Sequence, residues 1–206
     1  VAAESSTFVG ATDSGWSCAF LIFLAKSLRQ ETLLASSFDI QLIFFDGEEA
    51  LKSWTSTDSL YGSRHLAEKW ASDTGGNSLA NIELFVLLDL LGGKEMGQGT
   101  SRLYSQQAKS RHLFEGLMEI EQRRFPDSPK IFELKYPTGP DSSIFLENAV
   151  DDDHVPFMKH NVPIMHLIPV PFPTIWHTEK DDISALDREA CQKLSTILLE
   201  FVESLL

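Results

Sequence analysis

Residues 83–88 read ELFVLL, and Asp89 follows them directly. A short apolar run that ends at a polar residue is typical of a strand buried on both faces of a sheet. Residues 40–45 (IQLIFF), which end at Asp46, and residues 163–168 (PIMHLI) have the same character. Because near-continuous apolar strands that alternate with helices form parallel sheets covered on both sides, the three runs predict such a sheet.

Helical patterns lie between and around these strands. The first is dense in apolar residues, and the others repeat apolar side chains at helical spacing. The predicted helices are residues 18–29, 59–70, 111–125 and 187–206, and the predicted surface loops are residues 71–80 and 126–148. The predicted fold class is therefore α/β, with a single three-layer domain over residues 1–206 and a mostly parallel central sheet flanked by helices.

Composition excludes two classes of partner. The formal net charge is −13, and phosphate binding needs clustered Lys and Arg, so no nucleic acid is expected. Arg123 and Arg124 form the densest basic spot and are expected on a solvated helix face. No apolar run reaches the roughly 18 to 20 residues of a membrane span, and no signal peptide opens the chain. Cys18 and Cys191 are expected to be buried free thiols rather than a disulfide.

Polar residues follow the predicted strands where those strands end. In open α/β sheets, ligands bind outside the carboxyl ends of the strands, so these positions are candidates for chemistry. Each residue alone has an ordinary interpretation, since an Asp before a helix is usually an N-cap and a Glu pair after a strand is usually solvated. The candidates are Asp13, Asp46, Glu48, Glu49, Asp89, the run Asp151, Asp152, Asp153 and His154, and His177.

These residue types suit a metal. Zinc accepts carboxylate and imidazole ligands and keeps one position open in catalytic sites, whereas a histidine among few ligands disfavours magnesium. Adjacent Glu48 and Glu49 cannot point the same way from an extended segment, so one can bind metal while the other carries protons. The spacing alone leaves two interpretations open: a metal-assisted site that processes an amide, and an ordinary solvated acidic edge.

Longer segments resemble animal glutaminyl cyclases. They are residues 8–14 (FVGATDS), 41–50 (QLIFFDGEEA), 58–67 (DSLYGSRHLA), 84–91 (LFVLLDLL), 152–157 (DDHVPF) and 162–178 (VPIMHLIPVPFPTIWHT). The segments are in family order and run nearly end to end. The resemblance implies a zinc-dependent glutaminyl-peptide cyclotransferase with a zinc-exopeptidase-like fold. Such an enzyme converts the N-terminal glutamine of peptides, with glutamate as a further candidate, to pyroglutamate and releases ammonia.

The resemblance also implies roles for individual residues. One zinc per chain would be bound by Asp13, Glu49 and His177. Glu48 would be the general acid/base, and Asp89 and Asp152 would share hydrogen bonds with it. The substrate pocket would be formed by Trp54, Val150, Asp151, Phe172 and Trp176.

The chain departs from the family in a few places, and two other functions stay open. It lacks the family's N-terminal portion, in which the disulfide partner of a cysteine matched by Cys18 lies, and Trp16 stands close to Asp13. One alternative is a zinc aminopeptidase of the same fold, with two metals and Asp89 as a ligand. The other is an inactive truncated form that only binds peptide N-termini. The resemblance implies a secreted protein or one of the Golgi lumen.

Overall fold

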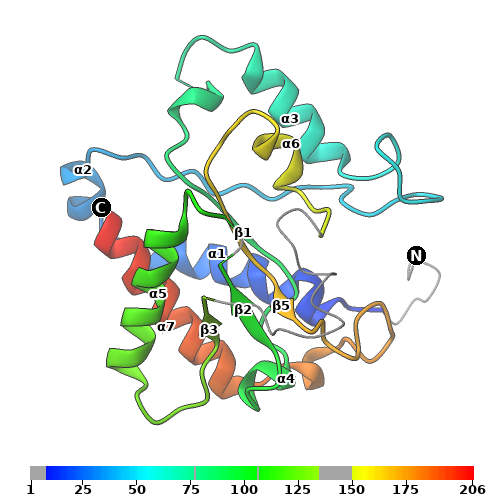
Figure 1. Cartoon of the computed structure of the whole chain (residues 1–206), viewed down its shortest axis with the longest axis vertical. Helices are drawn as coiled ribbons and strands as arrows, with labels where there is room; N and C mark the ends of the chain where they lie inside the picture. Colours follow the sequence, from blue (N-terminus) through cyan, green and yellow to red (C-terminus); the bar gives the residue numbers. More distant parts are fainter. Residues whose placement is uncertain (1–7, 77, 106, 135–149) are drawn as a thin grey trace.

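The computed structural model describes residues 8–76, 78–105, 107–134 and 150–206 (Figure 1). Its long helices are α1 (Trp16–Ser27), α3 (Tyr61–Ala71), α5 (Arg111–Arg124) and α7 (Arg188–Leu205). Each of them matches a predicted helix within a few residues. At the start of α7, the Asp187 side chain accepts a hydrogen bond from the Ala190 backbone N–H at 2.8 Å, which is an N-cap.

Shorter helical segments complete the chain. The short α-helices are α2 (Gln30–Ala35), α4 (Lys94–Gly97) and α6 (Val155–Met158). The other helical turns are the π-type turn η1 (Ala11–Gly15) and the 3₁₀ turns η2 (Leu79–Asn81) and η4 (Ile183–Ala185). The sequence analysis did not predict them, because so few residues do not establish a helical period. No helix in the described part of the chain is both long enough and apolar enough to cross a membrane.

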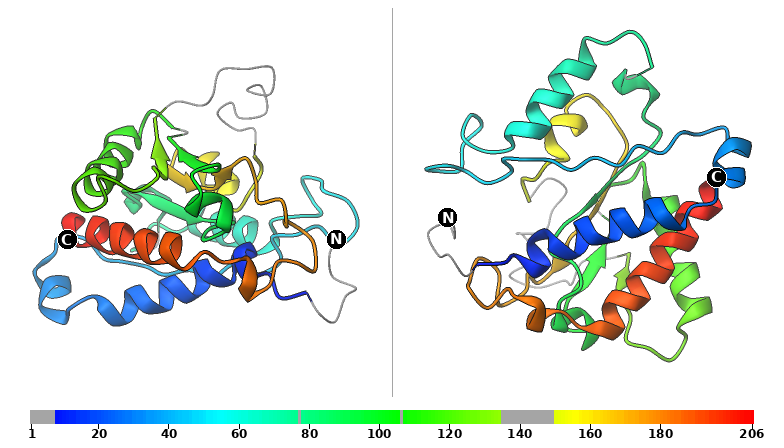
Figure 2. Two further views of the ribbon diagram at one scale, coloured as in Figure 1. Left: turned by 90° about the horizontal axis from the view of Figure 1, so that it is seen from below. Right: turned by 180° about the vertical axis from the view of Figure 1, so that it is seen from behind.

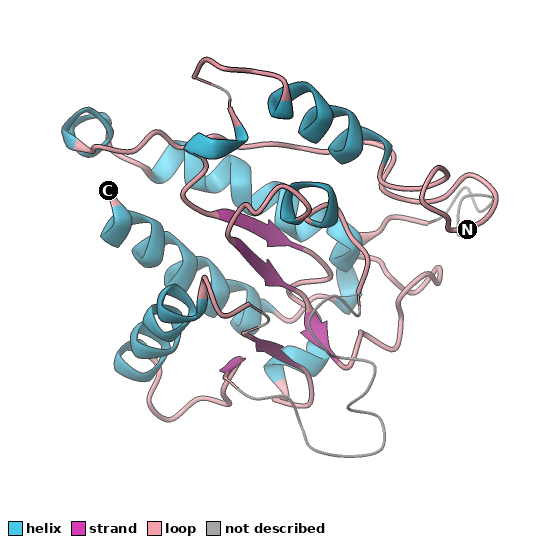
Figure 3. Ribbon diagram, turned by 45° about the horizontal axis from the view of Figure 1, so that its top comes forward, coloured by secondary structure: helices cyan, strands magenta, loops and turns pink. Residues whose placement is uncertain are grey.

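The strands form two small adjoining sheets (Figure 3). β1 (Phe85–Leu88) pairs in parallel with β4 (Ile164–Leu167). β2 (Arg102–Tyr104) pairs in parallel with β3 (Phe132–Glu133) and antiparallel with β5 (Pro169–Val170). Only one residue separates β4 from β5, so the two sheets meet along this segment. The predicted strands at residues 83–88 and 163–168 are confirmed, as is the mostly parallel pairing.

The prediction of a strand at residues 40–45 was wrong. Ile43 and Phe45 do pack against an apolar cluster, so the segment is partly buried as expected. No strand of the described chain pairs with it, and an extended segment becomes a strand only through hydrogen bonds to a neighbour. Apolarity predicted the burial of this segment but could not predict its pairing.

The predicted loops also need one correction. β3 lies inside residues 126–148, where only a loop was predicted, and β2 was not predicted as a strand at all. Strands of two or three residues are too short to show an alternating pattern. Residues 135–148 of this predicted loop lie outside the described residues.

Successive side chains of β4 point to opposite faces of the sheet. Ile164 packs into an apolar cluster that also contains Trp70 of α3 and Phe157 of α6. Met165 and Leu167 pack into the other cluster, which contains the buried residues of α1, α5 and α7. The strands therefore have helices on both faces, and the predicted three-layer α/β class is confirmed. Figure 2 shows α1 and α7 lying side by side, where they contact each other.

Trp16 points into the apolar cluster that contains the buried residues of α1, α5 and α7, rather than toward Asp13. Its indole is 9% exposed and stacks on Phe20, with ring centroids 5.5 Å apart. Gly92 makes room for it, because Gly92 has a φ of +86° and a Cβ there would lie 3.1 Å from the Trp16 ring and 2.9 Å from Cys191 Sγ. Trp16 thus packs in the core although it stands close to Asp13 in the sequence.

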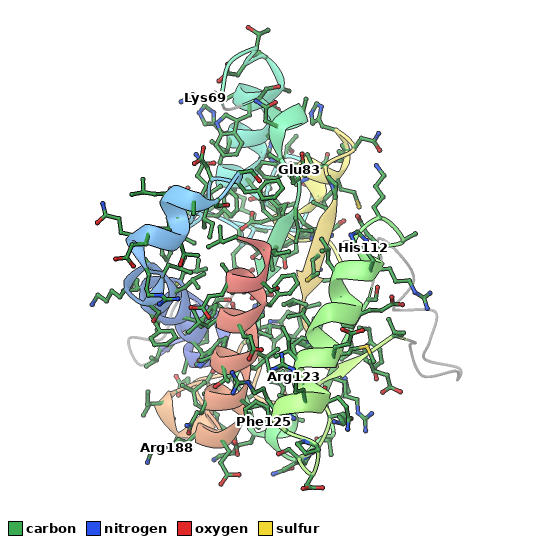
Figure 4. All side chains as sticks on the ribbon, turned by 90° about the vertical axis from the view of Figure 1, so that its left-hand side faces the viewer. Lys69, Glu83, His112, Arg123, Phe125 and Arg188 are labelled. Carbon is green, nitrogen blue, oxygen red and sulfur yellow. The ribbon has the colours of Figure 1, made fainter. Side chains whose placement is uncertain are left out.

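Cys18 and Cys191 are both free, as predicted, but the prediction that both are buried was wrong. Cys191 is half-buried, whereas Cys18 is exposed on the outer side of α1. Arg123 and Arg124, near the end of α5, are exposed as expected, and both bind Glu200 of α7. Figure 4 shows α5 and α7 next to each other, with Arg123 labelled.

A buried ion pair joins α5 and α7. Lys193 Nζ lies 2.8 Å from Glu121 Oε1, with side chains only 7% and 1% exposed. Glu121 also accepts hydrogen bonds from the backbone N–H groups of Ile131 and Phe132, at 2.7 and 3.3 Å. Lys193 donates a further bond to the Pro129 carbonyl at 2.6 Å. One carboxylate thus holds two helices and the start of β3 together.

Replacing Glu121 with alanine should destabilise the chain strongly. The change leaves a buried lysine charge and two backbone donors without their acceptor, a type of loss that costs about 3–5 kcal/mol. Urea unfolding followed by circular dichroism measures the free energy of unfolding. Glu115→Ala on the same helix removes an exposed pair with Arg111, which is worth about 0.3–0.5 kcal/mol. Equal losses in the two variants would contradict this role for Glu121.

Candidate metal and acid-base site

Asp13, Glu49 and His177 come together in space from three distant parts of the chain. His177 Nε2 lies 3.4 Å from Asp13 Oδ2 and 2.5 Å from Glu49 Oε1. One possible ligand atom from each residue lies within 4.8 Å of the others, so the three could hold a metal ion. The structure therefore groups all three residues that were predicted as metal ligands, at the solvent-facing edge where half of the Glu49 side chain is exposed.

The loop that carries Asp13 turns tightly before α1. Gly10 has a φ of +63°, and a Cβ at this position would lie 2.3 Å from the Asp13 carbonyl oxygen. Only glycine fits both the left-handed conformation and this close approach. The next residue, Ser14, follows a cis peptide bond, and its hydroxyl points to Asp89.

Glu48 lies among other carboxyl groups on the inner side of this set. Burial, followed by the charges of Asp152, Glu49, Asp89 and Asp153, raises its pKa from 4.5 to about 9. Each of these neighbours makes ionisation of Glu48 less favourable, because like charges repel in a poorly solvated environment. In the metal-free chain Glu48 therefore keeps, at neutral pH, a proton that an ordinary glutamate would have lost.

Asp89 follows β1 and is held by two donors. Ser14 Oγ donates to Asp89 Oδ1 at 2.6 Å, and the Leu90 backbone N–H donates to the same atom at 2.9 Å. Burial and the charge of Asp152 raise the pKa of Asp89 well above its ordinary value. The charge of Asp89 also raises the pKa of Glu48, so the two are electrostatic neighbours. The hydrogen bond expected between them stays a prediction.

Asp152 is paired with a histidine. Its Oδ2 lies 2.8 Å from His166 Nε2, and its Oδ1 accepts the Asp153 backbone N–H at 2.6 Å. Burial raises the pKa of Asp152 to about 7 and lowers the pKa of His166 to about 3. At neutral pH a neutral His166 can donate this hydrogen bond through Nε2, so the pair joins the same proton network as Glu48.

His166 and Ser14 were not among the residues predicted for this network, whereas Asp153 was a candidate. His166 is the only polar side chain in β4, and it points to the same face as Ile164. A histidine inside an apolar strand was the signal that could have found it. Burial and the charge of Asp152 also raise the pKa of Asp153 to about 7, although a hydrogen bond from Ser63 opposes the shift.

Asp152, His154 and His166 form a second group that could hold a metal by residue type. All three are buried, and burial together with His166 lowers the pKa of His154 to about 2. His166 Nε2 is already bonded to Asp152, and the two imidazole rings are tilted by 35° with centroids 4.3 Å apart. The group therefore contains a hydrogen-bonded pair and also remains a second candidate for binding a metal.

The predicted substrate-binding residues divide into two sets. Phe172 packs edge-on against Trp176, with centroids 5.1 Å apart, and Trp176 packs on the ring of His177 at 4.2 Å. Glu95 Oε1 anchors the segment between these two aromatic residues, because it accepts the Thr174 N–H and hydroxyl at 3.1 and 2.8 Å.

Trp54, Val150 and Asp151 are not part of that aromatic pair. Trp54 is 43% exposed, in a loop whose backbone N–H groups bind Asp58. Asp151 is exposed, and its charge raises the pKa of His154. Val150 beside it is half-buried. The structure brings Phe172 and Trp176 to the metal-binding candidates and leaves Trp54 on an open loop.

Comparison with known proteins places the chain in a family. It matches peptidase family M28 over residues 2–202. The chain belongs to peptidase family M28. A glutaminyl-peptide cyclotransferase of Dictyostelium discoideum is 42% identical over 216 residues, which cover 97% of this M28 chain and 56% of that protein. The chain thus spans about half the length of the curated relatives it matches.

Two solved structures have a fold similar to that of the chain. The crystal structure of Macrostomum lignano glutaminyl cyclase has a TM-score of 0.81 and 33% identity, and the match covers 98% of this chain and 64% of that one. A zinc aminopeptidase from Bacillus subtilis has a TM-score of 0.66 at 19% identity, with 97% and 43% covered. The second likeness concerns the fold alone.

The metal-free chain should lose stability as the pH rises from 7 to 9. Between its ordinary pKa of 4.5 and its folded pKa of about 9, Glu48 is protonated in the folded chain but not in the unfolded one. The contribution of protonated Glu48 to the stability of the fold is complete below pH 4.5 and is lost as the pH rises through 9. Melting temperatures recorded with a chelator present should therefore fall across this interval.

Glu48→Gln cannot ionise, so its melting temperature should depend less steeply on pH over the same interval. Glu115→Gln makes the same chemical change on the exposed face of α5 and should keep the parental slope. Identical slopes for the parent chain and Glu48→Gln would show that the pKa of Glu48 is not raised.

Proposed function

We propose that this chain is the catalytic α/β domain of a zinc-dependent glutaminyl-peptide cyclotransferase. It would convert the N-terminal glutamine of peptides and proteins to pyroglutamate and release ammonia, with N-terminal glutamate as a second substrate. The observation that carries the proposal is the placement of Glu48, with its raised pKa, beside the group of Asp13, Glu49 and His177. The relatives named glutaminyl-peptide cyclotransferase support the same reaction.

The donor set fits one zinc ion. Zinc binds His nitrogen and carboxylate oxygen at about 2.0–2.2 Å, and a catalytic site has three protein ligands and one open position. Three ligands come from Asp13, Glu49 and His177, and the 3.4 Å between His177 Nε2 and Asp13 Oδ2 suits two ligands of one ion. His177 and Glu49 are at hydrogen-bond distance, 2.5 Å, and would separate slightly around a cation. Bound zinc would supply a Lewis acid that polarises the substrate's γ-carbonyl.

The chain's own residues would then transfer one proton during the reaction. The substrate's α-amine nitrogen attacks its γ-carbonyl carbon, and the bond from that carbon to the amide nitrogen breaks. In the metal-free chain Glu48 holds a proton, because its pKa is raised to about 9. A zinc cation bound beside it would favour the carboxylate form. The Glu48 carboxylate would then take a proton from the α-amine, whose pKa is about 7.7–8.0, and return it to the departing nitrogen, which leaves as NH3.

Asp89 and Asp152 would hold the amine and the ammonia in place. Both hydrogen bonds that described residues donate to Asp89 end on Oδ1, which leaves Oδ2 to accept a bond from the substrate's amine. Asp152 is fixed by His166, so its charge stays next to Glu48. Together they would orient the amine for attack and keep the proton on Glu48 within reach.

Aromatic and nearby polar residues would form the substrate pocket. The edge-on pair of Phe172 and Trp176 lies against His177 and would cover the glutamine side chain and exclude water. We assign Trp54, Val150 and Asp151 to the outer part of the pocket. An aromatic cover over the reacting groups favours attack by the substrate's own amine over attack by water.

A zinc aminopeptidase is the second candidate. The likeness of the fold to the Bacillus subtilis enzyme and the second group formed by Asp152, His154 and His166 favour it. In that case Asp89 would bind a second metal. A non-catalytic form that only binds peptide N-termini is the third candidate. The proposed location, secreted or in the Golgi lumen, rests on the resemblance to animal glutaminyl cyclases.

Metal analysis separates the first two candidates. The purified chain should hold one zinc per molecule after dialysis against zinc-containing and then zinc-free buffer, because, of the two candidate donor sets among the described residues, Asp13, Glu49 and His177 are partly exposed to solvent whereas the other set is buried. His177→Ala should abolish this binding, whereas His112→Ala, on α5, should keep it. Two zinc ions per chain would favour the aminopeptidase.

Ammonia release from a short peptide with N-terminal glutamine tests the reaction itself. Release should stop with a chelator and return when zinc is added. Glu48→Gln should keep zinc but lose activity by a factor of about 10²–10⁴, the usual contribution of a general acid/base, while Glu115→Gln stays active. An active, zinc-loaded Glu48→Gln variant would contradict the role of Glu48. Silence from the folded, zinc-loaded parent chain would favour the binding protein.

A further inference from the structure

Asp181 is a fully buried carboxylate four positions after His177, and the mechanism above does not use it. Its side chain is 0% exposed. Burial of a carboxylate is costly unless its oxygens accept hydrogen bonds or meet a cation. Among the described residues no lysine or arginine forms an ion pair with it. Within the described part of the chain, the hydrogen bonds that its side-chain oxygens accept come from the loop that carries Asp13.

Three successive backbone N–H groups of that loop point at Asp181. The Thr12 N–H donates to Oδ1 at 2.7 Å, and the Asp13 N–H donates to Oδ2 at 3.1 Å. The Ala11 N–H donates to the Asp181 backbone carbonyl at 3.0 Å. Thr12 is itself fully buried. Bonds to an ionised acceptor are about twice as strong as neutral ones, so the carboxylate holds this stretch of backbone firmly.

The same residue is tied to the segment of His177. The Asp181 N–H donates to the Thr178 carbonyl at 3.1 Å, and the Thr178 N–H donates to the Ile175 carbonyl at 3.0 Å. These bonds close a compact turn directly after His177. Asp181 thus connects the two backbone segments whose side chains, Asp13 and His177, meet 3.4 Å apart.

We propose that Asp181 is a positioning residue of the metal site, which holds the Asp13 backbone against the turn after His177 so that both ligands face one point before any metal binds. Partners outside the direct ligands commonly set the orientation of metal ligands. The buried negative charge of Asp181, which no described cation offsets, would also favour a cation at the site. This inference rests on the metal site of the proposed function.

Zinc affinity tests the inference. The variant Asp181→Asn keeps the size of the side chain but replaces one acceptor oxygen with an NH2 group, which cannot accept the bond from Thr12 or Asp13. Competition with a chromophoric chelator near neutral pH should show affinity weakened by about 10- to 100-fold. Asp182→Asn is the matched control, because it removes the same charge one residue away and keeps the N-cap that Asp182 forms with the Ser184 N–H.

The outcomes separate this inference from the proposed function. If Asp181→Asn binds zinc as tightly as the parent chain does, the positioning role is overturned and the metal site is left intact. The same holds if Asp181→Asn lowers the melting temperature of the metal-free chain without changing zinc affinity, since the role would then be structural only. A parent chain that binds no zinc would overturn the metal site and this inference together.

Hydrogen exchange provides a test that needs no variant. In the metal-free parent chain, the amides of Thr12 and Asp13 should exchange slowly by nuclear magnetic resonance, because their bonds to Asp181 exist before metal binds. The exposed amides of Leu51 and Lys52, which bond to the exposed carboxylate of Asp58, provide the comparison and should exchange faster. Exchange of Thr12 and Asp13 as fast as this pair would overturn the inference even if Asp181→Asn did not fold.

Discussion

Repulsion between carboxylates is the constraint on which the rest of the site depends. Several acidic side chains meet where the strands end, and a protein can keep them together only by protons, hydrogen bonds or a cation. Glu48 keeps its proton, since its pKa is raised to about 9. Asp152 is hydrogen-bonded to His166, and Asp89 accepts a hydrogen bond from the Ser14 hydroxyl. Asp13 and Glu49 converge on His177, and there a cation would complete the balance of charge.

The fold supplies this crowding through the parallel pairing of β1 and β4. Parallel strands end at the same edge, so Asp89 after β1 comes close to the segment that follows β4 and ends at His177. Helices on both faces seal the sheet and leave that edge as the natural opening for a ligand. Asp181 then ties the Asp13 loop to the same edge through buried hydrogen bonds. The geometry of this site therefore depends on the layered fold as well as on the side chains that form the site.

The sequence predicted those features that depend on local pattern. The density and spacing of apolar residues were enough to predict β1, β4 and the four long helices, because burial in a core leaves a regular pattern in the sequence. The pattern did not predict β2 or β3, which are too short to alternate. It also assigned residues 40–45 to a strand, although pairing depends on a neighbour that a pattern of apolar residues does not reveal.

By itself the sequence determined the fold class and, through its motifs, which residues were candidates for the site. Asp13, Glu48, Glu49, Asp89 and His177 were recognisable because carboxylates and a histidine gather at the ends of several predicted elements and because they lie in segments that resemble glutaminyl cyclases. Only the tertiary structure decided which atoms meet and how each charge is balanced. His166 and Asp181 act across 14 and 168 positions of the chain. Such contacts depend on the path of the chain in space, and the residues near them in sequence carry no trace of it.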